Sequence, residues 1–184
     1  ATPVSGKMFN WTTTLNLASN KNEITSLKGY ISVDDSIRYS DPEGPGQTGA
    51  TLQLLKVGKP IGQFFSLRYA GKDQNGVSTF YKRDGTTTTS PAIGTDYFYV
   101  GDAQPRLLMG WNNSFRYGKW DLNVFLRGVF GNKIFNATRA DLSYVTAAAQ
   151  NNMLLSAKDD KINDNRNSYY STRYIESGNY IRLD

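Results

Sequence analysis

The most regular stretch of the chain is LLMGWNNSFRYGKWDLNVFLRGVF, residues 107–130, and its pattern sets the predicted fold class. Both halves alternate apolar and polar side chains at period two, the repeat of a β-strand with one apolar face. Gly118 and Lys119 separate the halves, and glycine at the first central position of a two-residue turn favours a type II′ hairpin. The stretch therefore predicts two long antiparallel strands joined by a tight turn.

The two faces of this hairpin differ in chemistry. One face carries apolar and aromatic side chains, interrupted only by Asn113: Leu107, Met109, Trp111, Phe115, Tyr117, Trp120, Leu122, Val124, Leu126 and Phe130. The opposite face is mostly polar, with Phe125 and Val129 as exceptions: Asn112, Ser114, Arg116, Asp121, Asn123 and Arg127. An aromatic, apolar face opposite a polar one is typical of a barrel strand between lipid and a water-lined lumen.

Four further segments carry strand patterns. Phe9–Leu17 alternates over its whole length, and Thr51–Lys56 and Ile61–Ala70 are predicted to form a hairpin that turns at residues 57–60. Tyr174–Leu183 is a weaker strand because Gly178 interrupts it. The sequence thus predicts about six strands, separated by two tight turns and three long connections at residues 18–50, 71–105 and 132–173.

The unequal connections favour one all-β architecture over another. Tight turns at one end and long polar loops at the other are typical of outer-membrane barrels. We therefore predict antiparallel β-strands forming part of a large transmembrane β-barrel with long extracellular loops. The alternative is a soluble β-sandwich serving as a carbohydrate-binding or adhesion module, in which Trp11, Phe115, Trp120 and Leu122 would be buried against a second sheet. Residues 147–158 are the only stretch that leans towards helix.

Composition argues against catalysis, because the chain contains no histidine and no cysteine. This removes imidazole bases, thiolate nucleophiles and their metal sites. A carboxylate-based glycosidase is a third, weaker alternative, with Asp34–Asp35 or Asp41 and Glu43 as its acid pair. The oxygen donors at residues 159–165 suit Ca²⁺ but lack the spacing of a calcium loop. We predict no enzyme activity, no catalytic residue, no cofactor and no metal.

The formal net charge is +5, but the basic residues are scattered and match no nucleic-acid motif. We therefore expect no nucleic-acid partner. The sequence also contains no stretch of about 20 apolar residues, the length of a membrane helix. The mean hydropathy of −0.52 does not exclude a membrane location, because apolar and polar faces of barrel strands cancel in that average.

Five short stretches, in order along the chain, resemble the SusC/RagA family of TonB-linked outer-membrane proteins. They are FNWTT (9–13) with Asn16 and NKNEI (20–24), VGKPIGQF (57–64), Gly101-Asp102 with Pro105-Arg106, WNNSFRYGKWDLN (111–123) with Gly128, Gly131, Asn132 and Asn136, and YIESGNYIRL (174–183). The resemblance implies that the chain is a C-terminal barrel fragment of such a protein. It implies a TonB-dependent importer of glycans or peptides in the bacterial outer membrane, working with a SusD-like surface lipoprotein, TonB and outer-membrane lipid.

On this interpretation residues 1–184 form part of a receptor barrel, with no plug, no TonB box and no barrel C-terminus. The charged residues expected to face the lumen are Arg68, Arg116, Asp121 and Arg127. The aromatic residues expected on the lipid-facing surface or in its interfacial girdle are Phe9, Trp11, Trp111, Phe115, Tyr117 and Trp120, and Tyr69 is expected near a strand end.

Overall fold

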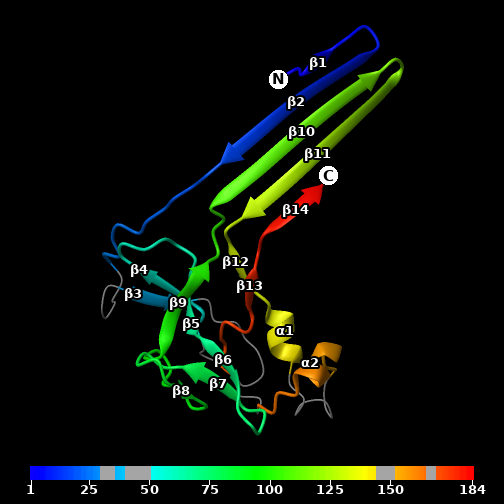
Figure 1. Cartoon of the computed structure of the whole chain (residues 1–184). Helices are drawn as coiled ribbons and strands as arrows, with labels where there is room; N and C mark the ends of the chain where they lie inside the picture. Colours follow the sequence, from blue (N-terminus) through cyan, green and yellow to red (C-terminus); the bar gives the residue numbers. More distant parts are fainter. Residues whose placement is uncertain (30–35, 40–50, 144–151, 165–168) are drawn as a thin grey trace. The chain divides into compact units, whose positions relative to one another are not determined.

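The computed structural model describes residues 1–29, 36–39, 51–143, 152–164 and 169–184. The chain divides into two compact units (Figure 1). The first, which we call the strand unit, consists of Ala1–Lys21, Gln104–Lys133 and Ser177–Asp184. The second, which we call the loop unit, consists of Asn22–Ala103 and Ile134–Glu176. No helix in the described part of the chain is long and apolar enough to cross a membrane.

The strand unit is one antiparallel five-stranded sheet in the order β1-β2-β10-β11-β14. Its strands are β1 (Val4–Ser5), β2 (Phe9–Ala18), β10 (Leu107–Tyr117), β11 (Trp120–Phe130) and β14 (Tyr180–Leu183). Three of them have 10 or 11 residues, which matches the ~9–11 residues of a strand that crosses a bilayer at a tilt. The expected period-two strands at 9–17 and 107–130 are confirmed.

The predicted turn between β10 and β11 is also confirmed. Tyr117 pairs with Trp120, so Gly118 and Lys119 are the only residues of the loop. Gly118 has φ 58°, whereas Lys119 is not among the residues of positive φ. A positive φ at the first central position alone is the backbone of a type II′ turn, whose twist suits an antiparallel pair.

The last predicted strand is broken where the sequence places a glycine. Ile175–Ser177 forms β13, which pairs with β12 (Lys133–Phe135), and Tyr180–Leu183 forms β14, which pairs with β11. The backbone N–H of Gly178 donates to the carbonyl of Asn132 at 3.0 Å between the two strands. The interruption therefore lets one segment serve two different sheets.

The loop unit is built from short strands and two short helices. A four-stranded sheet has the order β3-β4-β5-β9, with β3 (Ser36–Tyr39), β4 (Gln53–Lys56), β5 (Gln63–Leu67) and β9 (Tyr97–Asp102). A three-stranded sheet contains β6 (Tyr69–Lys72), β7 (Ser78–Tyr81) and β8 (Thr87–Thr88). The helices are α1 (Ala137–Leu142) and α2 (Leu155–Asp160).

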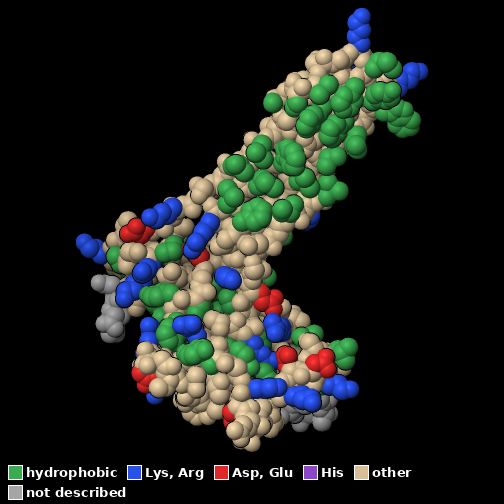
Figure 2. Space-filling model, viewed as in Figure 1, with side chains coloured by type: hydrophobic (Ala, Val, Ile, Leu, Met, Phe, Trp, Pro, Cys, Tyr) green, Lys and Arg blue, Asp and Glu red, His purple; other side chains and the backbone are tan. Residues whose placement is uncertain are grey.

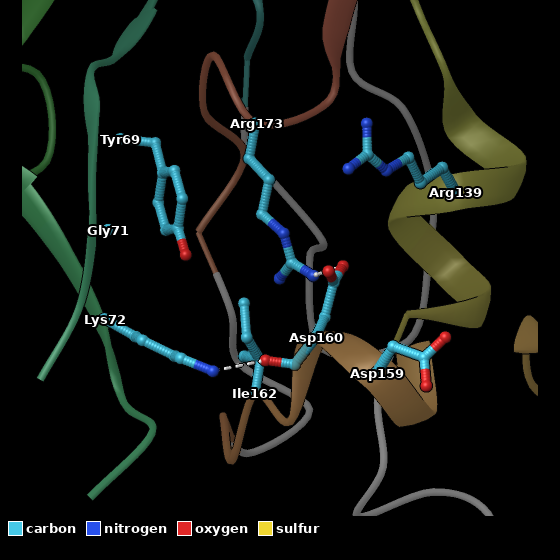
Figure 3. A pocket seen from close by; sticks show the side chains of 8 residues that line it. All are labelled: Tyr69, Gly71, Lys72, Arg139, Asp159, Asp160, Ile162 and Arg173. Atoms are coloured by element: carbon cyan, nitrogen blue, oxygen red, sulfur yellow. Dashed lines mark hydrogen bonds and ion pairs between the residues drawn. The ribbon is translucent and has the colours of Figure 1, made fainter. Parts of the chain in front are cut away.

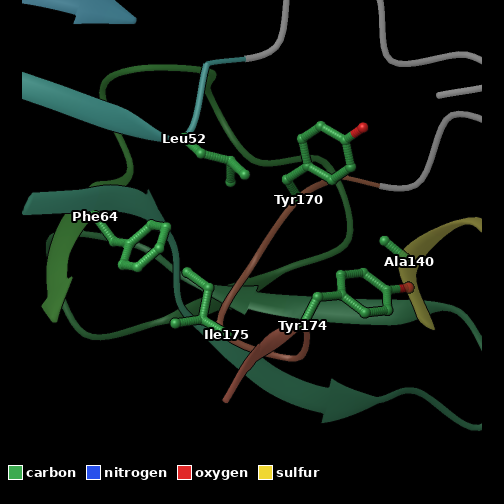
Figure 4. Close-up of a cluster of buried hydrophobic side chains, with 6 residues drawn as sticks. All are labelled: Leu52, Phe64, Ala140, Tyr170, Tyr174 and Ile175. Carbon is green, nitrogen blue, oxygen red and sulfur yellow. The ribbon is translucent and has the colours of Figure 1, made fainter. Parts of the chain in front are cut away.

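The core of the loop unit joins the two segments that compose it. Leu52 and Phe64 come from the first segment, and Ala140, Tyr170, Tyr174 and Ile175 come from the second (Figure 4). A second cluster, Leu54, Phe65, Leu67, Phe80 and Tyr97, lies within the first segment and is covered by Tyr169 of the second. Neither segment can bury its apolar residues alone, so the unit is stabilised by contacts between residues far apart in sequence.

The hairpin expected at 51–70 forms but does not join the long sheet. Its turn is in place, because the N–H of Lys59 donates to the carbonyl of Lys56 at 3.1 Å. However, β2 pairs directly with β10, so residues 19–106 are a single excursion from the long sheet. In β5, Phe64, Phe65, Ser66 and Leu67 are all buried, so this strand is covered on both faces. Four of the six expected strands thus contribute to the long sheet and two belong to the loop unit.

The helices show one hit and one miss. The helix-leaning stretch 147–158 overlaps α2, which begins at Leu155; residues 147–151 lie outside the described part of the chain. Helix α1 is not foreseen from composition. Its local signal is Asn136, whose side chain caps the helix by accepting from the backbone N–H of Arg139.

Candidate functional site: the two faces of the long sheet

The strand register places the apolar residues of all the long strands on the same face. Trp11 lies opposite Phe115, which lies opposite Leu122, and Leu15 lies opposite Trp111, which lies opposite Leu126. Ile181 and Leu183 of β14 continue this face. We call it the apolar face, and Figure 2 shows apolar side chains gathered along the long sheet. A one-residue slip at any pairing would move a whole strand's apolar set to the other side.

The aromatic residues of the apolar face concentrate beside the tight turn. Phe9, Tyr117 and Trp120 form the row next to Gly118, and Trp11 and Phe115 lie in the next paired row. Phe115 stacks on both neighbours across the strand pair, with ring centroids 6.5 Å from Phe9 and 5.9 Å from Trp11. Trp111 shares the face but lies near the middle of β10. An aromatic band at one end of the strands is the arrangement of an interfacial girdle.

Two polar residues, Thr13 and Asn113, lie opposite each other on the apolar face. The indole of Trp11 donates to Asn113 Oδ1 at 3.1 Å, and the indole of Trp111 donates to Thr13 Oγ1 at 2.8 Å. Asn113 is only 5% exposed, because the aromatic side chains cover it. The crossed bonds satisfy polar groups that hydrocarbon would leave without a partner. The interruption noticed in the sequence is therefore compatible with a lipid-facing surface.

The opposite face of the sheet carries three of the four charged residues expected in a lumen. Arg116 Nε lies 3.7 Å from Asp121 Oδ1, and both side chains are about two-thirds exposed. Arg127 Nη2 lies 3.0 Å from Asp184 Oδ2, and Arg182 Nε lies 2.6 Å from the other carboxylate oxygen of Asp184. Arg182 and Asp184 were missed in the sequence because their place beside Arg127 depends on the pairing of β14 with β11.

Arg68 and Tyr69 do not lie on the long sheet. Both belong to the loop unit, at the junction of β5 and β6. The Arg68 guanidinium lies over the rings of Tyr81 and Phe98, 5.2 and 5.3 Å from their centroids. Tyr69 packs edge-on against Phe80. Placing these two residues with the barrel strands is wrong, since local alternation at 61–70 continues into a strand buried on both sides.

The exposure of the apolar face distinguishes the two all-β alternatives. Within the strand unit, Leu122 is 58% exposed, Leu15 56% and Trp120 80%. A β-sandwich would bury these side chains under a second sheet, whereas the strand unit consists of a single sheet. An apolar surface of this extent requires an apolar environment, and lipid supplies one.

Both excursions of the chain leave the long sheet at the same end. Ala18 pairs with Leu108, and Val129 pairs with both Leu108 and Tyr180, so residues 19–106 and 131–179 begin and finish at neighbouring strand ends. The opposite end holds the two-residue turn. One end with a tight turn and the other with long excursions is the asymmetry of an outer-membrane barrel.

The acidic clusters have structural partners where they are described. Asp160 pairs with Arg173, and Asp164 accepts hydrogen bonds from the backbone and hydroxyl of Ser78. No group of three or more acidic residues arranged to hold a metal occurs in the described ranges. Asp34, Asp35, Asp41 and Glu43 lie outside the described residues.

The loop aromatics at 97–99 and 169–170 pack against other side chains. Tyr97 and Tyr170 are buried, Tyr99 contacts Phe65, and Tyr169 packs edge-on against Phe80. Burial raises the pKa of Tyr97, so its phenol stays neutral in its packed position. These aromatic residues therefore stabilise the loop unit.

Comparison with known proteins gives consistent relatives. No protein-family model matches the chain. The chain is 27% identical over 203 residues to TonB-dependent receptor P3 of Formosa agariphila, covering 98% of this chain and 19% of that protein. It is 26% identical over 193 residues to TonB-dependent receptor SusC of Bacteroides thetaiotaomicron, covering 100% of this chain and 19% of SusC. The chain thus spans about a fifth of the length of these curated relatives.

Solved structures show the same fold. A chain of the RagAB peptide transporter superposes with a TM-score of 0.72 at 17% identity, covering 99% of this chain and 21% of that one. The RagAB peptide importer in its open-open state gives a TM-score of 0.69 at 16% identity. With the two-faced sheet and the named relatives, this fold identifies the chain as a region of a SusC/RagA-type TonB-dependent outer-membrane protein.

Proposed function

We propose that the strand unit is part of the barrel wall of an outer-membrane nutrient importer and that the loop unit is part of its cell-surface region. The observation that carries this proposal is the long sheet with aligned apolar and polar faces. Its apolar face has the aromatic row and satisfied polar pair that a lipid-facing wall needs. The opposite face offers ion pairs and amide side chains to water.

In this proposal the turn at Gly118-Lys119 lies on the periplasmic side, because outer-membrane barrels have short periplasmic turns and longer extracellular loops. The loop unit then lies at the cell surface, where it contacts a SusD-like lipoprotein. A plug, a TonB-contacting segment and the remaining barrel strands would belong to other parts of the parent protein. The chain itself performs no catalysis.

The cargo is a glycan or a peptide. The curated relative named SusC and the structural neighbour whose title names a peptide transporter leave both classes open. Arg116, Asp121 and Arg127 face the lumen, where they guide cargo or brace the plug. Charged lumen residues in exposed ion pairs exchange partners at small cost, since such pairs contribute only ~0–1 kcal/mol each.

The wall can be tested with the chain's own tryptophans, because all three lie on the apolar face: Trp11, Trp111 and Trp120. The full-length parent is reconstituted in vesicles that carry bromine at defined acyl-chain depths. Fluorescence lost on replacing each tryptophan by phenylalanine isolates its signal. We expect Trp111 to be quenched most by bromine near the bilayer centre and Trp120 by bromine near the headgroups.

Quenching of all three signals by aqueous iodide, with none by bromolipids, would overturn the wall assignment. Import is tested separately, by uptake of labelled oligosaccharides and oligopeptides in cells with and without the parent gene. TonB depletion should abolish the uptake of whichever class is carried. Uptake that does not change on deletion or depletion contradicts the importer role.

A further inference from the structure

A cavity of about 510 Å³ lies within the loop unit and combines residues from both of its segments (Figure 3). Tyr69, Gly71 and Lys72 come from β6, and the remaining residues come from the second segment: Arg139, Asp159, Asp160, Ile162 and Arg173. The volume is within the ~300–1,000 Å³ of small-ligand sites. Neither the barrel wall nor the packing of the two cores accounts for this concentration of charge.

Arg173 is the fixed element of the cavity. Its side chain is 5% exposed, and its guanidinium donates to Asp160 Oδ2 at 3.0 Å and to the Tyr174 hydroxyl at 3.2 Å. The guanidinium also lies 5.8 Å from the centroid of the Tyr69 ring and 5.2 Å from that of Tyr174. A buried cation held this way is preorganised, so little side-chain entropy is lost when a ligand binds it.

Arg139 and Lys72 bring further positive charge to the same cavity. Arg139 Nη1 donates to Glu176 Oε1 at 3.0 Å, and that bond together with one from Asn136 lowers the pKa of Glu176. Lys72 Nζ donates to the backbone carbonyl of Asp160 at 2.6 Å. In Figure 3 the Lys72 and Arg173 side chains point towards Asp160 from different elements, whereas the Asp159 carboxylate points away from both.

The cavity holds more hydrogen-bond donors than its own acceptors use. A guanidinium has five N–H groups and an ammonium has three. The contacts above occupy two donors of Arg173, one of Arg139 and one of Lys72. Burial also raises the pKa of Tyr69, so its phenol is protonated at neutral pH and able to donate. The group that complements such a lining is an acceptor with negative charge and planar geometry.

We infer that this cavity binds a carboxylate group of a small ligand, with Arg173 and Arg139 as its guanidinium contacts and Lys72 as its ammonium contact. The carboxylate belongs to the C-terminus of a short peptide or to a uronic acid unit of an oligosaccharide, which present the same planar anion. This binding goes beyond the import role and does not depend on it. A ligand held here joins the two segments of the loop unit.

The test measures binding of four probes to the full-length parent in detergent by isothermal titration calorimetry. Triglycine is compared with triglycinamide, and trigalacturonate with its methyl ester, so each pair differs in charge but hardly in shape. We expect at least one free acid to bind about tenfold or more tightly than its neutral partner, as a charge-assisted hydrogen bond predicts. Which acid binds identifies the source of the carboxylate, and binding of both assigns recognition to the carboxylate alone.

Variants locate the binding site. Lys72→Gln and Arg139→Gln should each weaken the free acid about tenfold and leave the neutral partner unchanged. Lys72→Gln breaks none of the ion pairs given above, so it remains informative if Arg139→Gln perturbs the fold. Lys158→Gln is the matched control, since it removes a cation from α2 that does not line this cavity. Equal binding of acid and neutral probes, or unaltered binding to Lys72→Gln, would overturn the proposal.

Discussion

The strand unit and the loop unit place their apolar side chains in opposite directions. In the strand unit Leu15, Leu122 and Trp120 are more than half exposed, whereas in the loop unit Leu52, Leu67 and Tyr174 are almost completely buried. Both units are antiparallel β-structure drawn from the same aromatic-rich composition. The difference shows that the two units fold for different solvents: lipid for the outer face of the sheet, water for the surface of the loop unit.

The comparison also separates local from non-local folding. The strand unit is dominated by neighbouring long strands whose pairings extend from a two-residue turn. The loop unit depends on contacts such as the hydrogen bond from Ser66 Oγ to the carbonyl of Tyr170, across 104 residues. Each unit should therefore respond differently to the same kind of substitution, and the following experiments use that difference.

The largest effect is expected from truncating the core of the loop unit. Leu67→Ala removes a side chain that is 0% exposed, and we expect it to lower the free energy of unfolding of this unit by ~2–5 kcal/mol. Leu15→Ala is the control in the strand unit, where lipid can fill the space and no cavity forms. The measurement is urea unfolding of the parent in vesicles. Equal losses for the two variants would remove the distinction between the units.

A charge placed on the apolar face should have the next largest effect. Leu15 lies in the mid-strand row with Trp111 and Leu126, so Leu15→Arg should destabilise the inserted protein by ~2–4 kcal/mol. Asn16→Arg is the matched control, one residue along and on the opposite, water-facing side, and should cost little. The comparison is made by unfolding in vesicles. A greater loss from Asn16→Arg would reverse the two faces.

The crossed indole bonds provide a finer test of the lipid-facing surface. Asn113→Ala removes the acceptor of the Trp11 indole, and the donor left unsatisfied in hydrocarbon should cost ~1–3 kcal/mol. Trp11→Phe removes the donor, so the double variant should cost less than the sum of the single variants. A double-mutant cycle in vesicles measures this coupling. Strict additivity would show that the bond does not contribute in the membrane.

The smallest effect concerns pH. Hydrogen bonds from Arg139 and Asn136 hold the pKa of Glu176 below its usual 4.5, so the folded state favours the ionised form. This contribution to stability is present above pH ~4.5 and is lost as the pH falls through the lower folded pKa. Urea unfolding of the loop unit between pH 6 and pH 3 should show the loss, and Glu176→Gln should remove that component. An identical pH profile in the variant would contradict the assignment.

Much of the strand unit could be predicted from the sequence because its signals are local. The alternation at 107–130 and the glycine at 118 specify strand, face and turn within a few residues. Trp11, Trp111, Phe115 and Trp120 accordingly share one face in the structure. The resemblance to SusC/RagA proteins also rests on short stretches whose order along the chain can be recognised without coordinates.

The loop unit could not be predicted in the same way. The alternation at 61–70 is real, yet Arg68 and Tyr69 lie away from the long sheet because β2 pairs with β10 and bypasses them. Two of the motif stretches also meet in space, since the N–H of Ile61 donates to the side chain of Asn22 at 2.8 Å. No local pattern encodes a partner at that separation.

The sequence by itself determined the all-β class, the two-faced strands, the tight turn and the kind of outer-membrane protein. Period-two alternation and turn chemistry act over neighbouring residues, and a composition without histidine or cysteine restricts chemistry directly. Only the tertiary structure decided that two long excursions pack into one unit with its own core, and that Lys72, Arg139 and Arg173 line one cavity. Their assembly depends on burial and pairing between distant segments, which no local stretch of sequence specifies.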